Sequence, residues 1–104
     1  MSERLPDLLD EQDSKDEDET REPPMFKVLI HNDDFTTKAF VVELLVVVFS
    51  RSIDAATEIM WQAHRKGTGL CGVYTREVAE TKIKISSSMA TDAGFPLKLS
   101  MEED

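Results

Sequence analysis

The acidic segment at the start of this chain limits where the chain can fold. Residues 1–24 hold ten Asp or Glu against three Lys or Arg, so they carry −7 of the chain's formal charge of −9. A segment so rich in like charge and so poor in apolar residues cannot bury enough surface to offset the entropy lost on ordering. We expect residues 1–24 to be a disordered acidic extension, ended by Pro23 and Pro24. Residues 25–104 then remain for one small domain with a modest core.

Charge and composition exclude several classes of protein. With a pI of about 4.6, the chain would be repelled by nucleic-acid phosphates. Its longest apolar run, residues 41–49, is far shorter than the roughly 20 residues needed to cross a bilayer, and the acidic N-terminus has the character of neither a signal peptide nor a transit peptide. Cys71 is the single cysteine, which excludes an internal disulfide and fits a reducing compartment. These features predict a cytoplasmic protein without nucleic-acid or membrane partners.

Residue periodicity predicts that the folded part begins with a strand and a helix. Residues 26–30 alternate between two faces in the manner of a strand. Thr36 or Thr37 can then cap a helix whose apolar positions run over residues 40–49. The β-branched residues 46–48 would also suit a buried strand, but the cap and the length of the segment favour a helix.

The rest of the chain predicts two further helices and two further strands. A helix capped by Ser52 ends at Gly67, and a second helix capped by Thr75 runs from residue 76 to about residue 90 and ends at Gly94. The strands are expected over residues 70–74 and 97–101. The apolar sides of these helices are Ile53, Ala56, Ile59, Met60 and Ala63 in the first, and Ala79, Ile83 and Ala90, flanked by Val78, Ile85 and Met89, in the second. The order β-α-α-β-α-β indicates an α+β sandwich, in which a three-stranded antiparallel sheet packs against helices.

Polar side chains gather where the first strand should end. The sequence Asn32-Asp33-Asp34 brings two carboxylates and an amide together, a cluster that can hold a cation. That cation could be the ammonium of a ligand, whereas the same residue types are also ordinary in turns and at the starts of helices. A metal site is a third possibility, and its mixed nitrogen and oxygen ligands would be His31, Asp33, Asp34 and His64. No close-spaced His or Cys motif supports the metal site.

Two other kinds of catalytic site find little support in the sequence. The glycines at positions 67 and 69 lack the further residues of a phosphate-binding loop. Cys71 could be a nucleophile with His64 as its base, but Cys71 lies in a predicted apolar strand, where a buried structural thiol is the ordinary interpretation.

Four segments of the chain form one further pattern. They are Pro23-Pro24-Met25-Phe26-Lys27-Val28, then Asn32-Asp33-Asp34-Phe35-Thr36, then His64 ahead of Gly67, and then Cys71-Gly72-Val73-Tyr74-Thr75-Arg76-Glu77-Val78-Ala79-Glu80-Thr81-Lys82. Their order and spacing resemble the ClpS family of protease adaptors from residue 23 to about residue 101. The resemblance implies a protein that is not an enzyme and uses no cofactor. Such a protein binds substrates with a destabilising N-terminal residue (an N-degron) and delivers them to the N-terminal domain of a ClpA- or ClpC-type AAA+ unfoldase, whose peptidase degrades them.

By this resemblance, the cation is the α-ammonium of a substrate protein. Asn32, Asp33 and His64 would bind it directly or through water, and Asp34 would help to hold the loop and the next peptide group. An amide oxygen, a carboxylate and a neutral imidazole suit the three donors of an ammonium. An internal peptide would lose these charge-assisted bonds and bring in a continuing chain, so the site would select free N-termini.

The resemblance also implies a pocket for the first side chain of the substrate, expected to be Phe, Tyr, Trp or Leu. The pocket residues are Thr36, Lys38, Val41, Leu44, Met60, Ala63 and Leu97, several of which would otherwise be assigned to the core. Burying a large apolar side chain there would contribute roughly 1.5–3 kcal/mol. Many bacterial members carry Met where Lys38 stands, and Val is common at position 63. We therefore expect Lys38 and Ala63 to loosen the pocket and to alter the ranking of first residues.

The resemblance further implies that an unfoldase contacts Glu77, Glu80 and Lys82, on the exposed side of the last helix. Without the resemblance, these residues would form an ordinary solvated face stabilised by spaced charge pairs. The chain is expected to be a monomer. If it were a purely structural interaction domain instead, residues 46–48 would form an association patch, because their helix is more apolar all round than one buried face requires.

Overall fold

The computed structural model describes residues 22–104, so the predicted disordered extension lies outside the described residues except for its last three positions. Residues 22–24 are exposed and belong to no helix or strand. The elements are β1 (Met25–His31), α3 (Lys38–Phe49), α4 (Ile53–Lys66), β2 (Thr68–Thr75), α5 (Arg76–Ala93) and β3 (Lys98–Glu103). This order confirms the α+β prediction. None of the helices between residues 22 and 104 has the length and apolar character that a bilayer crossing requires.

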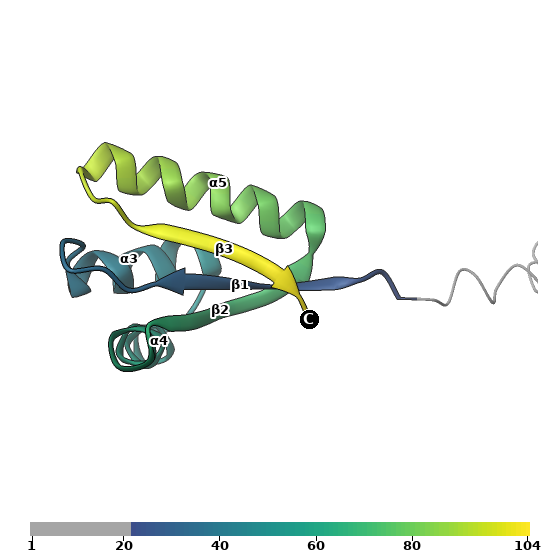
Figure 1. Cartoon of the computed structure of the whole chain (residues 1–104), viewed down its shortest axis with the longest axis horizontal. Helices are drawn as coiled ribbons and strands as arrows, with labels where there is room; N and C mark the ends of the chain where they lie inside the picture. The colour runs from purple at the N-terminus through teal and green to yellow at the C-terminus, as the bar shows by residue number, and fades with distance from the viewer. Residues whose placement is uncertain (1–21) are drawn as a thin grey trace, which may run out of the picture.

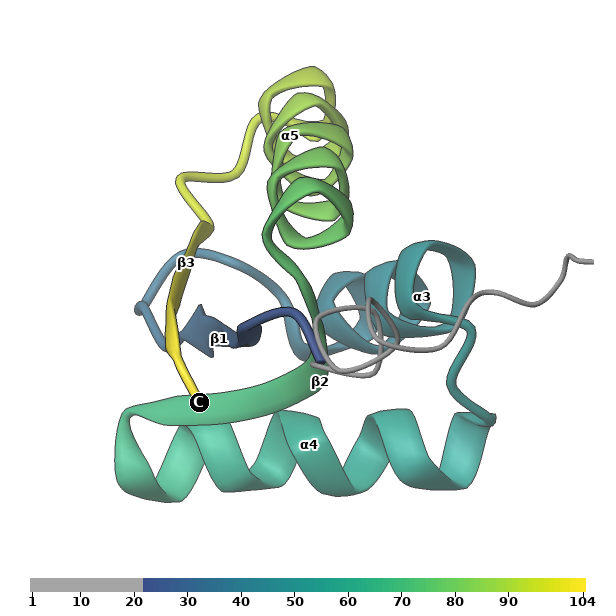
Figure 2. The same cartoon turned by 90° about the vertical axis from the view of Figure 1, so that its right-hand side faces the viewer.

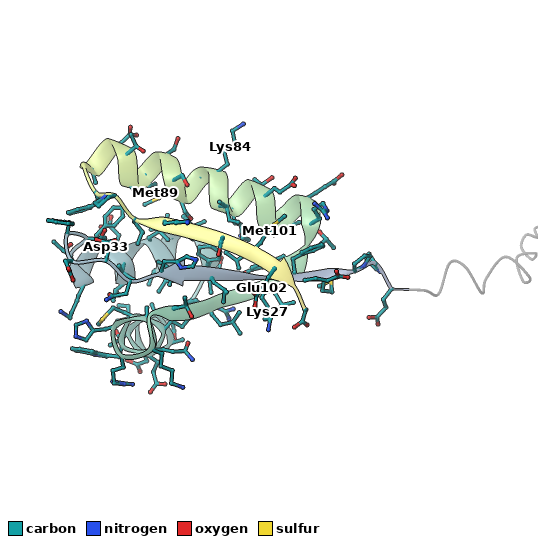
Figure 3. All side chains as sticks on the ribbon, viewed as in Figure 1. Lys27, Asp33, Lys84, Met89, Met101 and Glu102 are labelled. Atoms are coloured by element: carbon teal, nitrogen blue, oxygen red, sulfur yellow. The ribbon has the colours of Figure 1, made fainter. Side chains whose placement is uncertain are left out.

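The three strands pair antiparallel, as predicted, and their order in the sheet is β2-β1-β3. On the central strand β1, alternate residues Phe26, Val28 and Ile30 are buried. The other face is open: Figure 1 shows it toward the viewer, with α5 above the sheet, α4 below and α3 behind. In Figure 2, α5 lies above the sheet, α3 to the right of β1, and α4 along β2 from below. On the open face Lys27 pairs with Glu102 of β3 at 3.8 Å (Figure 3). The core therefore lies between one face of the sheet and the three helices.

Local sequence signals set the ends of the helices. Thr37 caps α3 by accepting a hydrogen bond from Phe40 N, and Ser52 caps α4 by accepting one from Ala55 N. These caps confirm two predictions, and the strand alternative for the segment now occupied by α3 is wrong. Gly67 ends α4 with a φ of 95°, a left-handed conformation that favours glycine. Thr75 precedes α5 as predicted, but its side chain makes no capping hydrogen bond.

Close packing between α4 and β2 requires a glycine at position 69. A Cβ at Gly69 would lie 2.7 Å from the carbonyl oxygen of Ile59, which is closer than real Cβ contacts allow. This close approach of α4 to β2 fixes how α4 lies along the sheet.

The strand β2 is longer than the predicted residues 70–74, because its pairing with β1 continues to Thr68 at one end and to Thr75 at the other.

The predicted apolar side of α4 was wrong at one position, because Ile53 at the start of that helix is 68% exposed. On α5 the predicted apolar side does face the core, and two of the residues predicted to flank it, Val78 and Ile85, are exposed. On α5 the residues turned toward the core recur every three or four positions and include a serine: Ala79, Ile83, Ser86 and Ala90. The small residues allow α5 to lie close to the sheet, so its larger apolar residues can remain on the outside.

Lys82 of α5 supplies the positive charge that the end of α3 lacks. The last turn of α3 contains no basic residue. Lys82 Nζ donates a hydrogen bond of 2.8 Å to the Val48 carbonyl oxygen, and it lies 5.7 Å from the ring centre of Phe49 and 5.3 Å from that of Tyr74. An ammonium at this position interacts favourably with the unpaired carbonyls at a helix C-terminus. Lys82 thus joins α5 to α3.

Candidate functional site

A small cavity opens where β1 ends and α3 begins. Its volume is about 170 Å³, well below the roughly 300–1,000 Å³ of sites for drug-sized ligands. The residues that line it come from β1, the following loop, α3, α4 and the approach to β3, and they are Ile30, His31, Asn32, Asp33, Asp34, Thr36, Lys38, Val41, Met60, Ala63, His64 and Leu97. Figure 3 shows Asp33 at this end of the sheet. Segments far apart in the sequence therefore meet around one space.

A backbone hydrogen bond joins the loop after β1 to the end of α4. Asn32 N donates to the Gly67 carbonyl oxygen at 2.9 Å, and Gly67 N donates to the Ala63 carbonyl oxygen at 2.8 Å. Gly67 follows α4 directly, and His64 lies in the last turn of that helix. These bonds bring the polar loop next to His64, although more than 30 residues separate them in the chain.

The carboxylate of Asp33 holds the loop in shape. Its Oδ1 accepts hydrogen bonds from Phe35 N at 2.8 Å and Thr36 N at 2.7 Å, and its Oδ2 accepts one from Thr36 Oγ1 at 2.8 Å. Partial burial by itself raises the pKa of Asp33, but the bonds from Thr36 and Phe35 favour the charged form and outweigh it, so the pKa lies below its ordinary value. Asp33 is therefore ionised near neutral pH.

Asp33 retains capacity to bind a ligand cation. An ionised carboxylate offers about four lone-pair positions, and the loop uses three of those on Asp33. Asn32, Asp34 and His64 are exposed at the same mouth and offer an amide oxygen, a second carboxylate and an imidazole. This acceptor-rich rim suits a compact cation with several N–H donors, such as a primary ammonium.

The inner part of the cavity is apolar. Val41, Met60, Ala63 and Leu97 are each exposed by less than a tenth, yet all of them line the cavity. A closed apolar cavity of roughly 150 Å³ is large enough to hold one benzene molecule. The space is thus matched to a single aromatic or large aliphatic side chain, with polar groups at its mouth.

The structure brings together all but one of the residues predicted for the two parts of this site. Leu44 is fully buried and does not line the cavity, because it lies one turn further along α3 than Val41 and packs into the core. Ile30 lines the cavity and was missed, although it is the last buried residue of β1 before the polar loop. Asp33 holds the loop through its own hydrogen bonds, a role that was predicted for Asp34.

The catalytic alternatives fit the structure poorly. Cys71 is fully buried, and burial raises the pKa of its thiol to about 12, although the nearby Arg51 guanidinium acts in the opposite direction. A thiol in that state is not a nucleophile at neutral pH. Within residues 22–104, no group of three or more His, Cys, Asp or Glu side chains could hold a metal ion. Of the four predicted metal ligands, His31 has its Nε2 2.7 Å from Ser100 Oγ on the open face of the sheet.

The residues expected to contact an unfoldase lie on α5, away from the cavity. Glu77 and Glu80 are exposed near the start of this helix, and Glu80 lies 3.9 Å from Arg76. Figure 1 places the start of α5 at the opposite end of the sheet from the loop after β1. Lys82 is partly buried and bonded to α3, so only part of its side chain is available to a partner.

Comparison with known proteins identifies relatives along most of the chain. Residues 21–100 match the family model described as "ATP-dependent Clp protease adaptor protein ClpS". The ATP-dependent Clp protease adapter protein ClpS of Nitratidesulfovibrio vulgaris (strain DSM 19637 / Miyazaki F) is 56% identical over 87 residues, which cover 84% of this chain and 87% of the relative. The ClpS of Desulfatibacillum aliphaticivorans is 54% identical over 102 residues, covering 98% of this chain and 94% of the relative.

One solved structure is also similar in three dimensions. It is the structure of Agrobacterium tumefaciens ClpS2 bound to L-phenylalaninamide, with a TM-score of 0.77 and 38% sequence identity. The match covers 80% of this chain and all of that chain.

The hydrogen bonds to Asp33 predict how the loop responds to acid. Because they favour the charged carboxylate, their contribution to loop stability is complete above the ordinary pKa of 3.8 and is lost as the pH falls through the lowered pKa. An NMR titration of the Asp33 carboxyl should therefore have its midpoint below 3.8. At neutral pH, Asp33→Ala should speed hydrogen exchange at the amides of Phe35 and Thr36, and the control Asp34→Ala should not. A midpoint at or above 3.8, or equal effects of both variants, would contradict the role given to Asp33.

Proposed function

The chain belongs to the ClpS family, whose members are adaptors of the Clp protease and not enzymes, and we propose that it binds N-degron substrates. In this proposal the mouth of the cavity binds the free α-ammonium of the substrate, and the apolar interior takes a first side chain of Phe, Tyr, Trp or Leu. The adaptor then delivers the substrate to a ClpA- or ClpC-type AAA+ unfoldase for degradation.

The observation that carries this proposal is the joining of two kinds of surface in one small cavity. An acceptor-rich rim around Asp33 adjoins an apolar interior, and the whole cavity of about 170 Å³ is large enough for one aromatic ring. Phenylalaninamide, the ligand of the Agrobacterium relative, has both of the matching features: a primary amine and a benzyl side chain. A free Phe N-terminus presents the same two groups.

The rim also accounts for selectivity against internal segments of a protein. An internal residue offers one amide N–H in place of an ammonium, and it forfeits the charge-assisted bonds, each of which contributes about 1.5–3 kcal/mol. It also carries a preceding residue, for which a cavity of about 170 Å³ has little room. We therefore propose that Asn32, Asp33, Asp34 and His64 recognise the chain end itself.

Delivery would use the face of α5 that carries Glu77 and Glu80. The start of α5 and the loop that borders the cavity lie at opposite ends of the sheet (Figure 1), which supports simultaneous binding of substrate and unfoldase. We further propose that the adaptor acts as a cytoplasmic monomer, without a cofactor and without nucleic-acid or membrane partners.

Peptides that differ only at the first position test the binding proposal. A peptide with a free Phe N-terminus should bind about tenfold to a hundredfold more tightly than its Ala-initiated counterpart, because the Phe ring buries more apolar surface. Leu should rank near Phe, and N-acetylation of the Phe peptide should abolish binding. Calorimetry on this series measures each affinity. Affinity that ignores the first residue or the acetyl group would refute the assignment of the cavity.

Charge reversal on α5 tests delivery separately from substrate binding. Glu77→Arg should abolish binding of the unfoldase N-terminal domain and leave the affinity for the Phe peptide unchanged. Unchanged unfoldase binding by Glu77→Arg would remove Glu77 from the proposed contact.

Lys82→Met tests the link between α5 and α3. This change should lower the free energy of unfolding by about 1–2 kcal/mol, because it removes the hydrogen bond to Val48. Lys84→Met is the matched control, since Lys84 is exposed on the same helix (Figure 3).

A further inference from the structure

Trp61 of α4 lies beside the mouth of the cavity, between two residues of the site. Lys38 Nζ lies over the indole ring, 5.7 Å from its centre. The imidazole of His64 meets the same indole nearly at a right angle, with the ring centres 5.6 Å apart and the planes at 83°. Trp61 is 39% exposed and is not among the residues that line the cavity. It therefore contacts residues of the rim without occupying the binding space.

These contacts fix where the Lys38 ammonium goes. A cation over the face of an indole is attracted by the negative potential of the ring, and edge-to-face packing against His64 holds the indole in one orientation. Lys38 is the first residue of α3 and one of the residues that line the cavity, and its ammonium lies over the Trp61 ring. Trp61 is not a lining residue, so the charge of Lys38 is held beside the cavity.

The position of that charge matters because two carboxylates share the mouth. Lys38 follows Asp34 by four residues and Asp33 by five, and all three line the same cavity. Among residues 22–104 the ion pairs are Lys27–Glu102 and Arg76–Glu80, so neither carboxylate is paired with Lys38 as the site stands. A Lys38 released from Trp61 could turn its ammonium toward these carboxylates and occupy the place of a ligand ammonium.

We propose that Trp61 is a positioning residue that prevents Lys38 from inhibiting the site. By holding the Lys38 ammonium over its ring, Trp61 leaves the acceptors of Asp33 and Asp34 free for the α-ammonium of a substrate. This inference rests on the proposed function, since it concerns binding of a free N-terminus at that rim. It also gives Lys38 and Trp61 a joint role: a lysine at this position is compatible with ammonium binding because a tryptophan faces it.

A double-mutant cycle tests the proposal in the full chain. Trp61→Leu, Lys38→Met and the double variant are compared with the unmodified chain for affinity toward a Phe-initiated peptide. Trp61→Leu should weaken binding about two- to fivefold, as expected from the loss of one exposed cation–π contact. In the Lys38→Met background the same change should have no effect, and added salt should reduce the deficit of the single variant. Trp61→Phe, which keeps an aromatic face, should restore much of the affinity.

A second measurement needs no ligand, because Trp61 is the only tryptophan of the chain. Lys38→Met should change the tryptophan emission spectrum, and the control Lys84→Met should not. If Trp61→Leu fails to fold, Trp61→Phe in both Lys38 backgrounds replaces it in the cycle, with a smaller effect expected.

The possible outcomes separate the inference from the function on which it rests. Equal losses from Trp61→Leu in both Lys38 backgrounds would overturn the inference alone, because a purely structural role does not depend on the lysine. An unchanged tryptophan emission spectrum in Lys38→Met would also overturn the inference alone. Failure of the unmodified chain to bind the Phe peptide would overturn the proposed function and the inference together.

Discussion

The carboxylate of Asp33 accepts three hydrogen bonds from the two residues that follow Asp34, and the geometry of the site depends on this turn. The turn carries the chain from the end of β1 to Thr37, which caps α3. It thereby determines where α3 begins and where Lys38 and Val41 stand relative to the cavity. The bond from Asn32 to Gly67 ties the other side of the loop to α4. One short polar segment thus aligns both helices that contribute to the cavity.

The Asp33 carboxylate can also bind a ligand, because the hydrogen bonds that shape the loop use only three of its about four lone-pair positions. Binding sites are most precise when the residues that contact the ligand are held by neighbouring hydrogen bonds, which limits the entropy lost on binding. Asp33 meets this condition through its hydrogen bonds with Phe35 and Thr36, and His64 is held instead by edge-to-face ring packing against Trp61. The apolar interior needs no such bonds, since packing against the core fixes it. The cavity thus combines hydrogen-bond acceptors with apolar surface, and the single cysteine, Cys71, is buried outside its lining.

Much of the fold could be predicted because its signals are local. Alternation marked β1, and Thr37, Ser52 and Gly67 marked helix ends that the structure confirms. What could not be predicted depends on contacts between elements. The sequence pattern does not distinguish Asp33 from Asp34, since only the folded turn shows which carboxylate faces Thr36. Leu44 and Val41 share one helical face, and only the depth of the cavity separates them.

If the cavity binds a charged chain end, as we propose, affinity must fall when a peptide lacks its α-amine. Replacing the first Phe by 3-phenylpropionyl removes the ammonium and adds no atoms, so steric exclusion cannot explain a loss of affinity. We expect the des-amino peptide to bind at least about tenfold more weakly than the Phe peptide, because it forfeits charge-assisted hydrogen bonds. Calorimetry with both peptides gives the comparison. Equal affinities would show that binding depends on the apolar interior alone and that the rim does not recognise the α-ammonium.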